Sequence, residues 1–466
     1  MADKAAIQHP GDFDLDGLLI IGSTGLKMEV GNLVQEVNLF QNLNSPYMEG
    51  DILLNDNTGL STRFPFLGQE RLLFGFQTPG HYPVDFNKYH AVLYNTKKRV
   101  HNADRSQTVL LDFTTLDNLK NFQTKISKSF KGVISSIVEE IIKSPKFLGS
   151  GKPIHIDETV NRRKFVVPNI KPYSAVEMLK EEAVSADESS PHYLFYENPE
   201  GYHFRSLDSL LGKQKRPIAP KATYVYQHPA AAVNTKNRNI FAAINTILHW
   251  EIHDNTNTFI NLRNGMYAST LFTHDIFNKN IQEFKFDYDS GYKSRHSTNM
   301  NKKGHASLVP DLKDEDGEKI TEKFKSKIFV HPTGNDNHIE GLHNNAEHWL
   351  QESRSRYVER MTNFNLKIDT YGNTDIMVGD IIEVIIPSNE PMPPSAAKDS
   401  IDRVLSGRYL VTALHHMIQP PIQMHTMTMT VTKDSFENSP VWLETKYKTP
   451  PQRSVDIGIK NRVYMQ

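Results

Sequence analysis

The sequence predicts a mainly β protein of the α+β class, with two antiparallel β-barrel regions and a smaller α+β unit between them. Towards both ends of the chain, short apolar runs alternate with Gly, Asn, Asp and Pro, which is the pattern of strands and turns. Between these regions the apolar residues take the spacing of amphipathic helices. At the usual ~150 residues per domain, 466 residues have room for about three units.

Composition and charge exclude several classes of protein. The 53 Lys and Arg residues nearly balance the 54 Asp and Glu residues, so no overall field draws the chain to nucleic acid or an anionic membrane. With 0 Cys, disulfides, thiolate nucleophiles and Cys-ligated metal centres are excluded. Residues 1–16 lack the apolar core of a secretory signal, and no apolar run approaches the ~20 residues that cross a bilayer. We expect a soluble protein that works where it is made.

Residues 1–115 are expected to form the first β-barrel. Strands are predicted at residues 18–21, 37–40, 52–54 and 72–76, separated by closely spaced turn signals. The intervals are too short for helical crossovers, which favours antiparallel pairing.

Residues 116–215 are expected to form the α+β unit, beginning with an amphipathic helix that ends at Ser144 and Pro145. The apolar face of this helix consists of Ile134, Ile137, Val138, Ile141 and Ile142. An aromatic β-hairpin is predicted at residues 193–205, because the turn signal Asn198-Pro199-Glu200-Gly201 divides two aromatic runs. We expect its Tyr202 and Phe204 to be buried in the core.

A second helix is expected after Pro172. Ser174 and Glu177 have the spacing of a capping box, whose side chains satisfy free backbone donors at the start of a helix. Its apolar stripe consists of Val176, Leu179 and Ala183.

The rest of the chain is expected to complete the barrels. Residues 216–295 are predicted to be a β-rich connecting segment that completes both barrels, and residues 296–343 a polar surface insertion. Residues 344–435 are predicted to hold a helix, at about residues 345–361, and the second barrel. Residues 436–466 form a C-terminal tail.

Strict alternation marks one strand of the second barrel. Met427, Met429 and Val431 are expected to face one side, towards the core, and four threonines the other side, towards solvent. These threonines are Thr426, Thr428, Thr430 and Thr432. Further strands are predicted at residues 364–368, 381–386 and 409–413.

The two β regions share a faint internal repeat. Residues 67–70 lead into the strand at 71–76, and residues 377–380 lead into the strand at 381–386. In both places a glycine turn beside an acidic residue precedes an apolar strand, although such turns are common.

The 20 histidines raise the question of metal binding. His249 and His253 have the spacing of a shared helix face, but the glutamate of a His-Glu-x-x-His motif is missing. His415 and His416 lie in a strand pattern and must point to opposite faces, one inward and one towards water.

A calcium-binding loop is also rejected. Asp314, Asp316 and Gly317 match three of its positions. The positions that need an acid, an apolar residue and a closing glutamate are occupied by Leu312, Lys319 and Lys323. We expect a solvated acidic loop.

No motif for nucleophilic, phosphate-binding or dinucleotide chemistry is present in the sequence. The paired acids at residues 139–140 and 181–182 lie on polar helix faces and do not by themselves indicate a glycosidase. We therefore predict a protein that is not an enzyme, with no catalytic, cofactor-binding or metal-binding residues and no cofactor.

Five stretches, in order along residues 15–435, resemble the central baseplate hub proteins of contractile-tailed bacteriophages. This family is related to the late control D proteins and to the hub part of type VI secretion spikes. The stretches are residues 47–56 with 65–72, residues 126–132, residues 171–176 with the hairpin and 204–207, residues 264–269, and residues 378–380 with 406–411. Each stretch alone has low specificity, but the occurrence of all five in this order is specific. The insertion at 296–343 and the tail have no counterpart in the family pattern.

The resemblance implies a homotrimer in which each subunit contributes two tube-like β-barrels, so that three subunits form a pseudo-sixfold ring. Such a ring adapts a hexameric tail tube to a trimeric central spike and surrounds a channel through which DNA passes at ejection. The near-zero net charge suits a channel, because a strongly basic lining would bind passing phosphates.

The resemblance also implies partners and a location. The partners are a tail tube or tube-initiator protein, the central spike protein, a tape measure protein and baseplate wedge or sheath-adjacent proteins. DNA only passes through, and no membrane is contacted. The protein belongs in the tail baseplate of the virion, assembled in the bacterial host cytoplasm. Two alternatives are a tail-associated cell-wall-degrading enzyme and a glycan-binding module.

Overall fold

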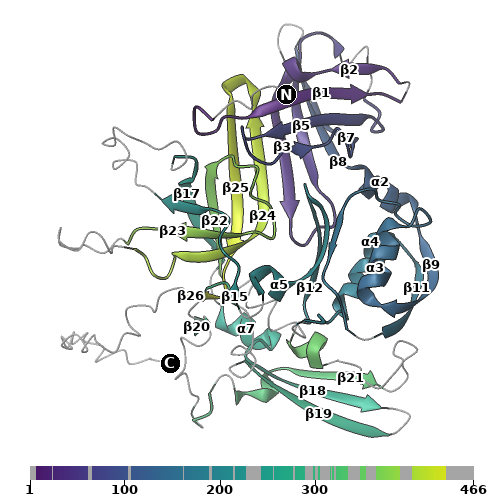
Figure 1. Ribbon diagram of the computed structural model, residues 1–466, viewed down its shortest axis with the longest axis vertical. Helices are drawn as coiled ribbons and strands as arrows, with labels where there is room; N and C mark the ends of the chain where they lie inside the picture. The colour runs from purple at the N-terminus through teal and green to yellow at the C-terminus, as the bar shows by residue number, and fades with distance from the viewer. Residues whose placement is uncertain are drawn as a thin grey trace, which may run out of the picture.

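The computed structural model describes residues 7–23, 25–60, 64, 66–102, 106–160, 162–187, 191–213, 216–226, 243–254, 257–275, 279–288, 297–299, 303–304, 315, 317–319, 322–333, 347–352, 364–388 and 401–436. In this part of the chain the fold is mainly β, with two large β regions and a smaller α+β unit, which confirms the predicted class (Figure 1). None of the described helices is long and apolar enough to cross a membrane.

The first β region is a curved antiparallel sheet with the strand order β2-β1-β5-β7-β8-β4-β3, in which β6 also pairs with β5. Its elements are β1 (Asp14–Ile21), β2 (Lys27–Glu29), the 3-10 helix η1 (Gly31–Leu33), β3 (Val34–Asn42), β4 (Glu49–Asp56), β5 (Arg71–Gln77), β6 (Val84–Asp85), β7 (Ala91–His101) and β8 (Gln107–Thr115). Alternate side chains of these strands fill one core, in which Phe74 stacks on Phe86 with ring centres 4.8 Å apart.

The second β region is a closed ring of six strands, because its order β24-β23-β16-β17-β22-β25 ends with β25 pairing back to β24. Its elements are β16 (Thr223–Tyr226), β17 (Thr246–Asp254), β22 (Asn365–Tyr371), β23 (Ile381–Ile385), β24 (Gly407–Gln419), the 3-10 helix η9 (Pro420–Ile422) and β25 (Met424–Thr432). The pairings of β16 with β17 and β23 are parallel, unlike the expected antiparallel ones. A short hairpin would force antiparallel pairing, but β16 is separated from β17 and from β23 by long stretches of chain, so parallel pairing is possible.

The long strand β24 joins the two β regions (Figure 1). Its first residues pair with β23, and residues 413–418 lie between β25 and β3. Ile418, near its end, is fully buried and belongs to the core of the first region. The sheet is therefore continuous from one region to the other.

The α+β unit packs two helices against a three-stranded sheet of order β10-β13-β12 and a two-stranded antiparallel sheet of β9 and β11. Its elements are α2 (Leu116–Gln123), β9 (Ile126–Val133), α3 (Ile134–Lys143), β10 (Ile154–Ile156), β11 (Arg162–Ile170), α4 (Pro172–Glu181), β12 (Tyr193–Asn198), β13 (Gly201–Ser206), α5 (Leu207–Leu211), β14 (Gly212–Lys213) and β15 (Arg216–Pro217). The first predicted helix and the aromatic hairpin are confirmed as α3 and β12–β13, and Tyr202 and Phe204 are fully buried.

Two local predictions are wrong. Ser174 and Glu177 form no capping box at the start of α4: Lys171 occupies the N-cap without a side-chain bond, and Pro172 begins the helix because it has no N–H to satisfy. Thr432 does not face solvent but is buried, and its hydroxyl donates to the Phe364 carbonyl oxygen at 3.1 Å. The core-facing side of the same strand, at Met427, Met429 and Val431, is confirmed as buried.

A third, small sheet of order β19-β18-β21 lies at the bottom of Figure 1. Its strands are β18 (Ala268–Asp275), β19 (Asn280–Asp287) and β21 (Ile328–Thr333), accompanied by α7 (Thr258–Asn264), the 3-10 helix η5 (Phe324–Ser326) and the π-helix η6 (Glu347–Glu352). Of the helix predicted at residues 345–361, only η6 falls within the described residues.

The described parts of residues 296–343, predicted to be a polar surface insertion, include a paired strand and buried residues. β21 is a strand of the small sheet, and Thr298 is buried, with its hydroxyl donating to Asp434 at 2.6 Å. The short strand β20 (Lys303–Gly304) pairs with β26 (Ser435–Phe436). Hydrogen bonds to residues distant in the sequence offset the conformational entropy that is lost when this polar stretch is ordered. The predicted domain boundaries themselves remain predictions.

Candidate functional site

The repeat noticed in the sequence is the same kind of turn in both β regions. In the first region the Glu70 carboxylate accepts a hydrogen bond from the N–H of Leu67 at 2.7 Å, three residues earlier. In the second region the Asp380 carboxylate accepts one from the N–H of Met377 at 2.8 Å, again three residues earlier. Strands β5 and β23 begin directly after these acids. In each turn the carboxylate accepts a hydrogen bond from the preceding backbone, and this bond fixes the residue at which the strand starts.

The backbone around the two turns is similar in part. A glycine in the left-handed conformation lies inside each turn, Gly68 with φ +81° and Gly379 with φ +92°, although Gly68 is two residues before its acid and Gly379 one residue before. The main-chain oxygen of each acid then accepts a hydrogen bond at 2.9 Å, from Leu93 in the first region and from Val411 in the second. The two regions are thus copies of one construction in at least this part.

The electrostatic settings of the two acids differ. Glu70 is almost completely buried, and its carboxylate also accepts from the N–H groups of Gly68 and Gln69. Burial raises the pKa of Asp380, whereas Lys221, whose Nζ lies 2.9 Å away, opposes this rise. The first turn is held by backbone donors and the second partly by a cation.

Buried histidines lie where β24 meets β25. His416 and His425 are fully buried, with Nδ1 of the first 3.1 Å from Nε2 of the second. Burial lowers the pKa of His425 to about 3 and that of His416 well below its usual value, with His425 adding to the latter effect. His415 points to the opposite face, half-buried, and its Nε2 lies 2.7 Å from the Asn38 side-chain oxygen.

A buried carboxylate of the α+β unit, paired with a lysine of the same unit, connects this unit to the first β region. Glu197 on β12 is fully buried and forms an ion pair with Lys152. The same carboxylate accepts from the N–H of Met48 at 3.3 Å and from the Thr115 hydroxyl at 3.1 Å. Burial raises the pKa of Glu197, and Lys152 counteracts that rise. Both partners are needed, because a lone buried charge is strongly destabilising.

One face of the small sheet exposes apolar side chains. The registers of β18 with β19 and β21 place Ile281, Phe272 and Val330 on one face, together with Ile328. Val330 is 73% exposed and Ile281 65% exposed. We name these four residues the open sheet face. Clustered exposed apolar side chains of this kind indicate a surface for protein contacts.

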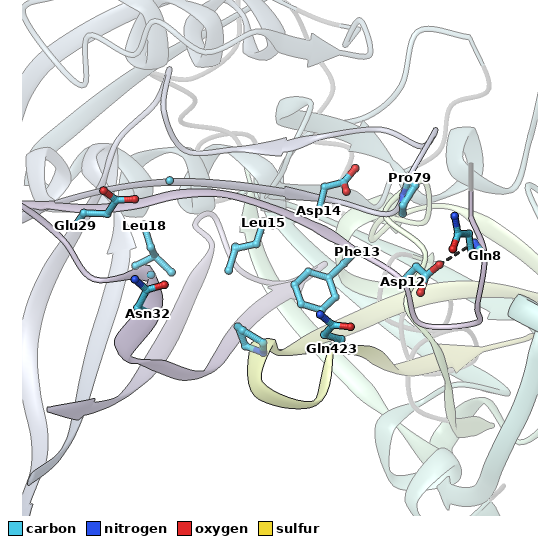
Figure 2. Close-up of a pocket in the computed structure, with 13 residues that line it drawn as sticks. Gln8, Asp12, Phe13, Asp14, Leu15, Leu18, Glu29, Asn32, Pro79 and Gln423 are labelled. Atoms are coloured by element: carbon cyan, nitrogen blue, oxygen red, sulfur yellow. Dashed lines mark hydrogen bonds between the residues drawn. The ribbon is translucent and has the colours of Figure 1, made fainter. Parts of the chain in front are cut away.

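A shallow groove of about 540 Å³ lies between the N-terminal segment, β1 and the turn after β24 (Figure 2). Three of its described lining residues are acidic: Asp12, Asp14 and Glu29. The Asp12 carboxylate is engaged by the N–H of Gln8 at 2.7 Å, drawn as a dashed line in Figure 2. Among the described residues that line the groove there is no Lys, Arg, His or Ser, so the groove has neither the cations that bind phosphate nor a nucleophile with a base.

No family model matches this chain, but a phage protein is similar to it in sequence. The probable baseplate hub protein gp334 of Vibrio phage KVP40 is 24% identical over an alignment of 353 residues that covers 71% of this chain and 73% of the relative. The resemblance to phage baseplate hub proteins is confirmed.

One solved tail protein shares this fold. A tail protein from Neisseria meningitidis MC58 has a TM-score of 0.53 at 10% identity, with 91% of this chain and 97% of that chain covered. A 43 kDa tail protein of prophage MuSo2 from Shewanella oneidensis has a TM-score of 0.48 at 8% identity, covering 90% of this chain and 98% of that chain. The hub-like chain therefore shares its mainly β fold with a bacterial tail protein.

The two histidines with the spacing of a shared helix face, His249 and His253, do not come together in this fold. His249 and His253 lie on strand β17, not on a helix, where a rise of about 3.3 Å per residue separates them by roughly 13 Å. Two residues so far apart cannot bind one ion. Of the rejected calcium loop, Asp314 and Asp316 lie outside the described residues.

One group of side chains with the spacing of a metal site has no local signal in the sequence. His155, Glu200 and His203 each offer one ligand atom, and these atoms lie within 4.8 Å of one another. Burial lowers the pKa of His203 to about 3, which keeps its imidazole neutral at ordinary pH. No sequence motif could reveal this group, because its first member comes from β10 and the others from the β12–β13 hairpin.

Proposed function

We propose that this chain is a structural hub protein of a contractile phage tail baseplate, acting as a homotrimer. In this role it adapts a hexameric tail tube to a trimeric central spike and lines the channel through which DNA passes. The observation that carries the proposal is the repeated construction of the two β regions, each with the same strand-starting turn. Three subunits with two similar regions each supply six similar units, which match a sixfold partner.

The continuity of the sheet through β24 supports this role. Because β24 pairs with strands of both regions, the two regions keep a constant orientation, as a ring of six similar units requires. The near-neutral net charge of −1 also suits a channel that DNA passes without being retained.

We infer that the open sheet face contacts a second subunit. In a ring of identical subunits, an exposed apolar patch on one copy has another copy as its natural partner. The remaining partners belong to the same proposal: a tail tube or tube-initiator protein, a spike, a tape measure protein and wedge or sheath-adjacent proteins. So does assembly in the host cytoplasm. A structural, non-catalytic role agrees with the baseplate hub relative.

The test is the mass of the purified protein by light scattering after size exclusion, alone and mixed with tube and spike proteins of the same phage. We expect three times the 53.2 kDa chain mass and a ring-shaped particle. The variant Val330→Lys should lose the trimer, because it places a charge on the open sheet face. The control Val166→Lys, at a residue 58% exposed on the α+β unit, should keep it.

A monomer both alone and with these partners would contradict the hub proposal. Loss of turbidity when the protein is added to bacterial cell walls would instead support the cell-wall-degrading alternative.

A further inference from the structure

A group of possible metal ligands lies on the three-stranded sheet of the α+β unit. Strand β10 pairs in parallel with β13, and His155 is directly opposite His203 in that register. Their side chains therefore project from the same face, and their rings stack with centres 4.7 Å apart. The opposite face of the sheet carries Tyr202 and Phe204, which pack into the core with α3 and α4.

The buried member of the group has a ring nitrogen with no partner. His203 is 5% exposed, and its Nδ1 has no hydrogen-bond partner among the described residues. The other ring nitrogen, Nε2, lies 2.8 Å from the side-chain oxygen of Asn198. That oxygen also accepts the N–H of Glu200 at 2.9 Å, which identifies it as the oxygen of the amide. Nε2 therefore carries the proton, and Nδ1 has a free lone pair.

The third ligand is positioned by the hairpin turn. Glu200 lies between β12 and β13, and the turn is held against the start of β10 by a hydrogen bond from the N–H of Tyr202 to the Pro153 oxygen at 2.9 Å. Gly201, with φ +136°, permits this approach, since a Cβ there would lie 2.4 Å from the same oxygen. The carboxylate is thereby kept beside the two histidines.

We propose that His155, Glu200 and His203 bind one Zn²⁺ ion, with water completing the coordination. Two imidazoles and one carboxylate are ligands that suit Zn²⁺, whereas Mg²⁺ and Ca²⁺ require oxygen ligands. A tetrahedral site places ligand atoms about 3.3 Å apart. The present ligand atoms lie within 4.8 Å of one another, so zinc binding requires the exposed His155 and Glu200 side chains to rotate towards His203.

Bound zinc ties the edge strand β10 to the β12–β13 turn. Asn198 acts as the outer partner that orients the His203 ring, an arrangement usual for metal-bound histidines. On its other side His203 stacks on Tyr196 with ring centres 4.8 Å apart. Tyr196 packs into the core of the second β region, so the ion stiffens the sheet at its contact with that region. This inference does not depend on the hub proposal.

The experiment uses the full chain without a histidine tag, stripped with a chelator that is then removed. Zn²⁺ is added, the affinity is measured by calorimetry, and the melting temperature is recorded with and without the ion. We expect one Zn²⁺ per chain and a higher melting temperature, because the ion binds the folded state. His155→Ala and Glu200→Gln, both at exposed positions, should weaken binding at least ~tenfold and abolish the thermal shift.

The matched control is His253→Ala, which removes an exposed strand histidine far from the group and should bind zinc like the unaltered protein. X-ray absorption spectroscopy at the zinc edge should detect two imidazole ligands. The proposal is overturned if the unaltered protein retains no zinc after gel filtration. It is equally overturned if His155→Ala and Glu200→Gln, shown to be folded, bind zinc as tightly as the control.

Discussion

The two β regions start their strands with the same turn but complete their sheets differently. In the second region β25 pairs back to β24 and the ring is closed. In the first region the described strands β2 and β3 are the two ends of an open series, and β3 pairs with β24 of the other region. One region is therefore complete by itself, whereas the other uses its neighbour to cover an edge.

This difference explains how the chain makes one rigid body from two similar parts. The strand that closes the second ring is also the strand that protects the edge of the first sheet. Ile418 shows the consequence at the level of side chains, because it belongs to β24 but is packed in the core of the first region. We therefore expect the two regions to unfold together.

The largest effect is expected from Phe74→Ala. Phe74 is fully buried and contacts the rings of Phe86 and Phe113, so its loss should cost about 3–5 kcal/mol of the free energy of unfolding. Because β24 belongs to both regions, denaturant unfolding should remain one transition that shifts as a whole. The control Leu26→Ala, at an exposed residue of the same region, should change stability by no more than about 0.5 kcal/mol.

Two separate transitions, with only one displaced by Phe74→Ala, would show that β24 does not couple the regions.

A smaller effect should distinguish the two repeated turns. Glu70→Gln removes one of two oxygens that together accept three backbone N–H groups, and should cost about 1.5–3 kcal/mol. Asp380→Asn should cost about 1 kcal/mol or less, because the carboxylate is already disfavoured by burial and Asn can still accept the Met377 N–H. Chemical denaturation of both variants measures the difference. Equal losses would mean that the two turns are equivalent in energy as well as in geometry.

The last expected effect depends on pH and concerns the contact of β24 and β25. The pKa of His425 is about 3 in the folded chain and near 6.5 when unfolded, so the unfolded chain binds more protons between these values. Stability should be full above about pH 6.5 and fall by about 1.4 kcal/mol per pH unit for this histidine as the pH decreases towards 3. His416, its pKa also lowered, adds to the loss.

Unfolding midpoints measured across this pH range for the double variant His416→Leu and His425→Leu check this expectation. The acid-induced loss should become smaller in the double variant and stay unchanged in His253→Gln. Identical pH profiles for the double variant and the unaltered protein would exclude the pair as the source of acid sensitivity.

Much of the local structure could be predicted from the sequence. Helix α3 and strand β25 follow from their apolar spacing, because a helix or strand that packs on a core must place apolar residues on one side. The turns before β5 and β23 follow from a glycine and an acid that act on their own backbone. The metal-ligand group did not follow, since no local spacing relates His155 to Glu200 and His203.

The sequence by itself determined the fold class, the helices α3 and α4 and the aromatic hairpin, because each depends on residues close together in the chain. The likeness to hub proteins came from the order of several short stretches along the chain. Only the tertiary structure decided that β24 serves both regions, that β16 pairs in parallel and that Thr432 is buried. These features depend on which distant strands meet. Pairing between distant strands depends on the packing of the whole chain, which local patterns do not encode.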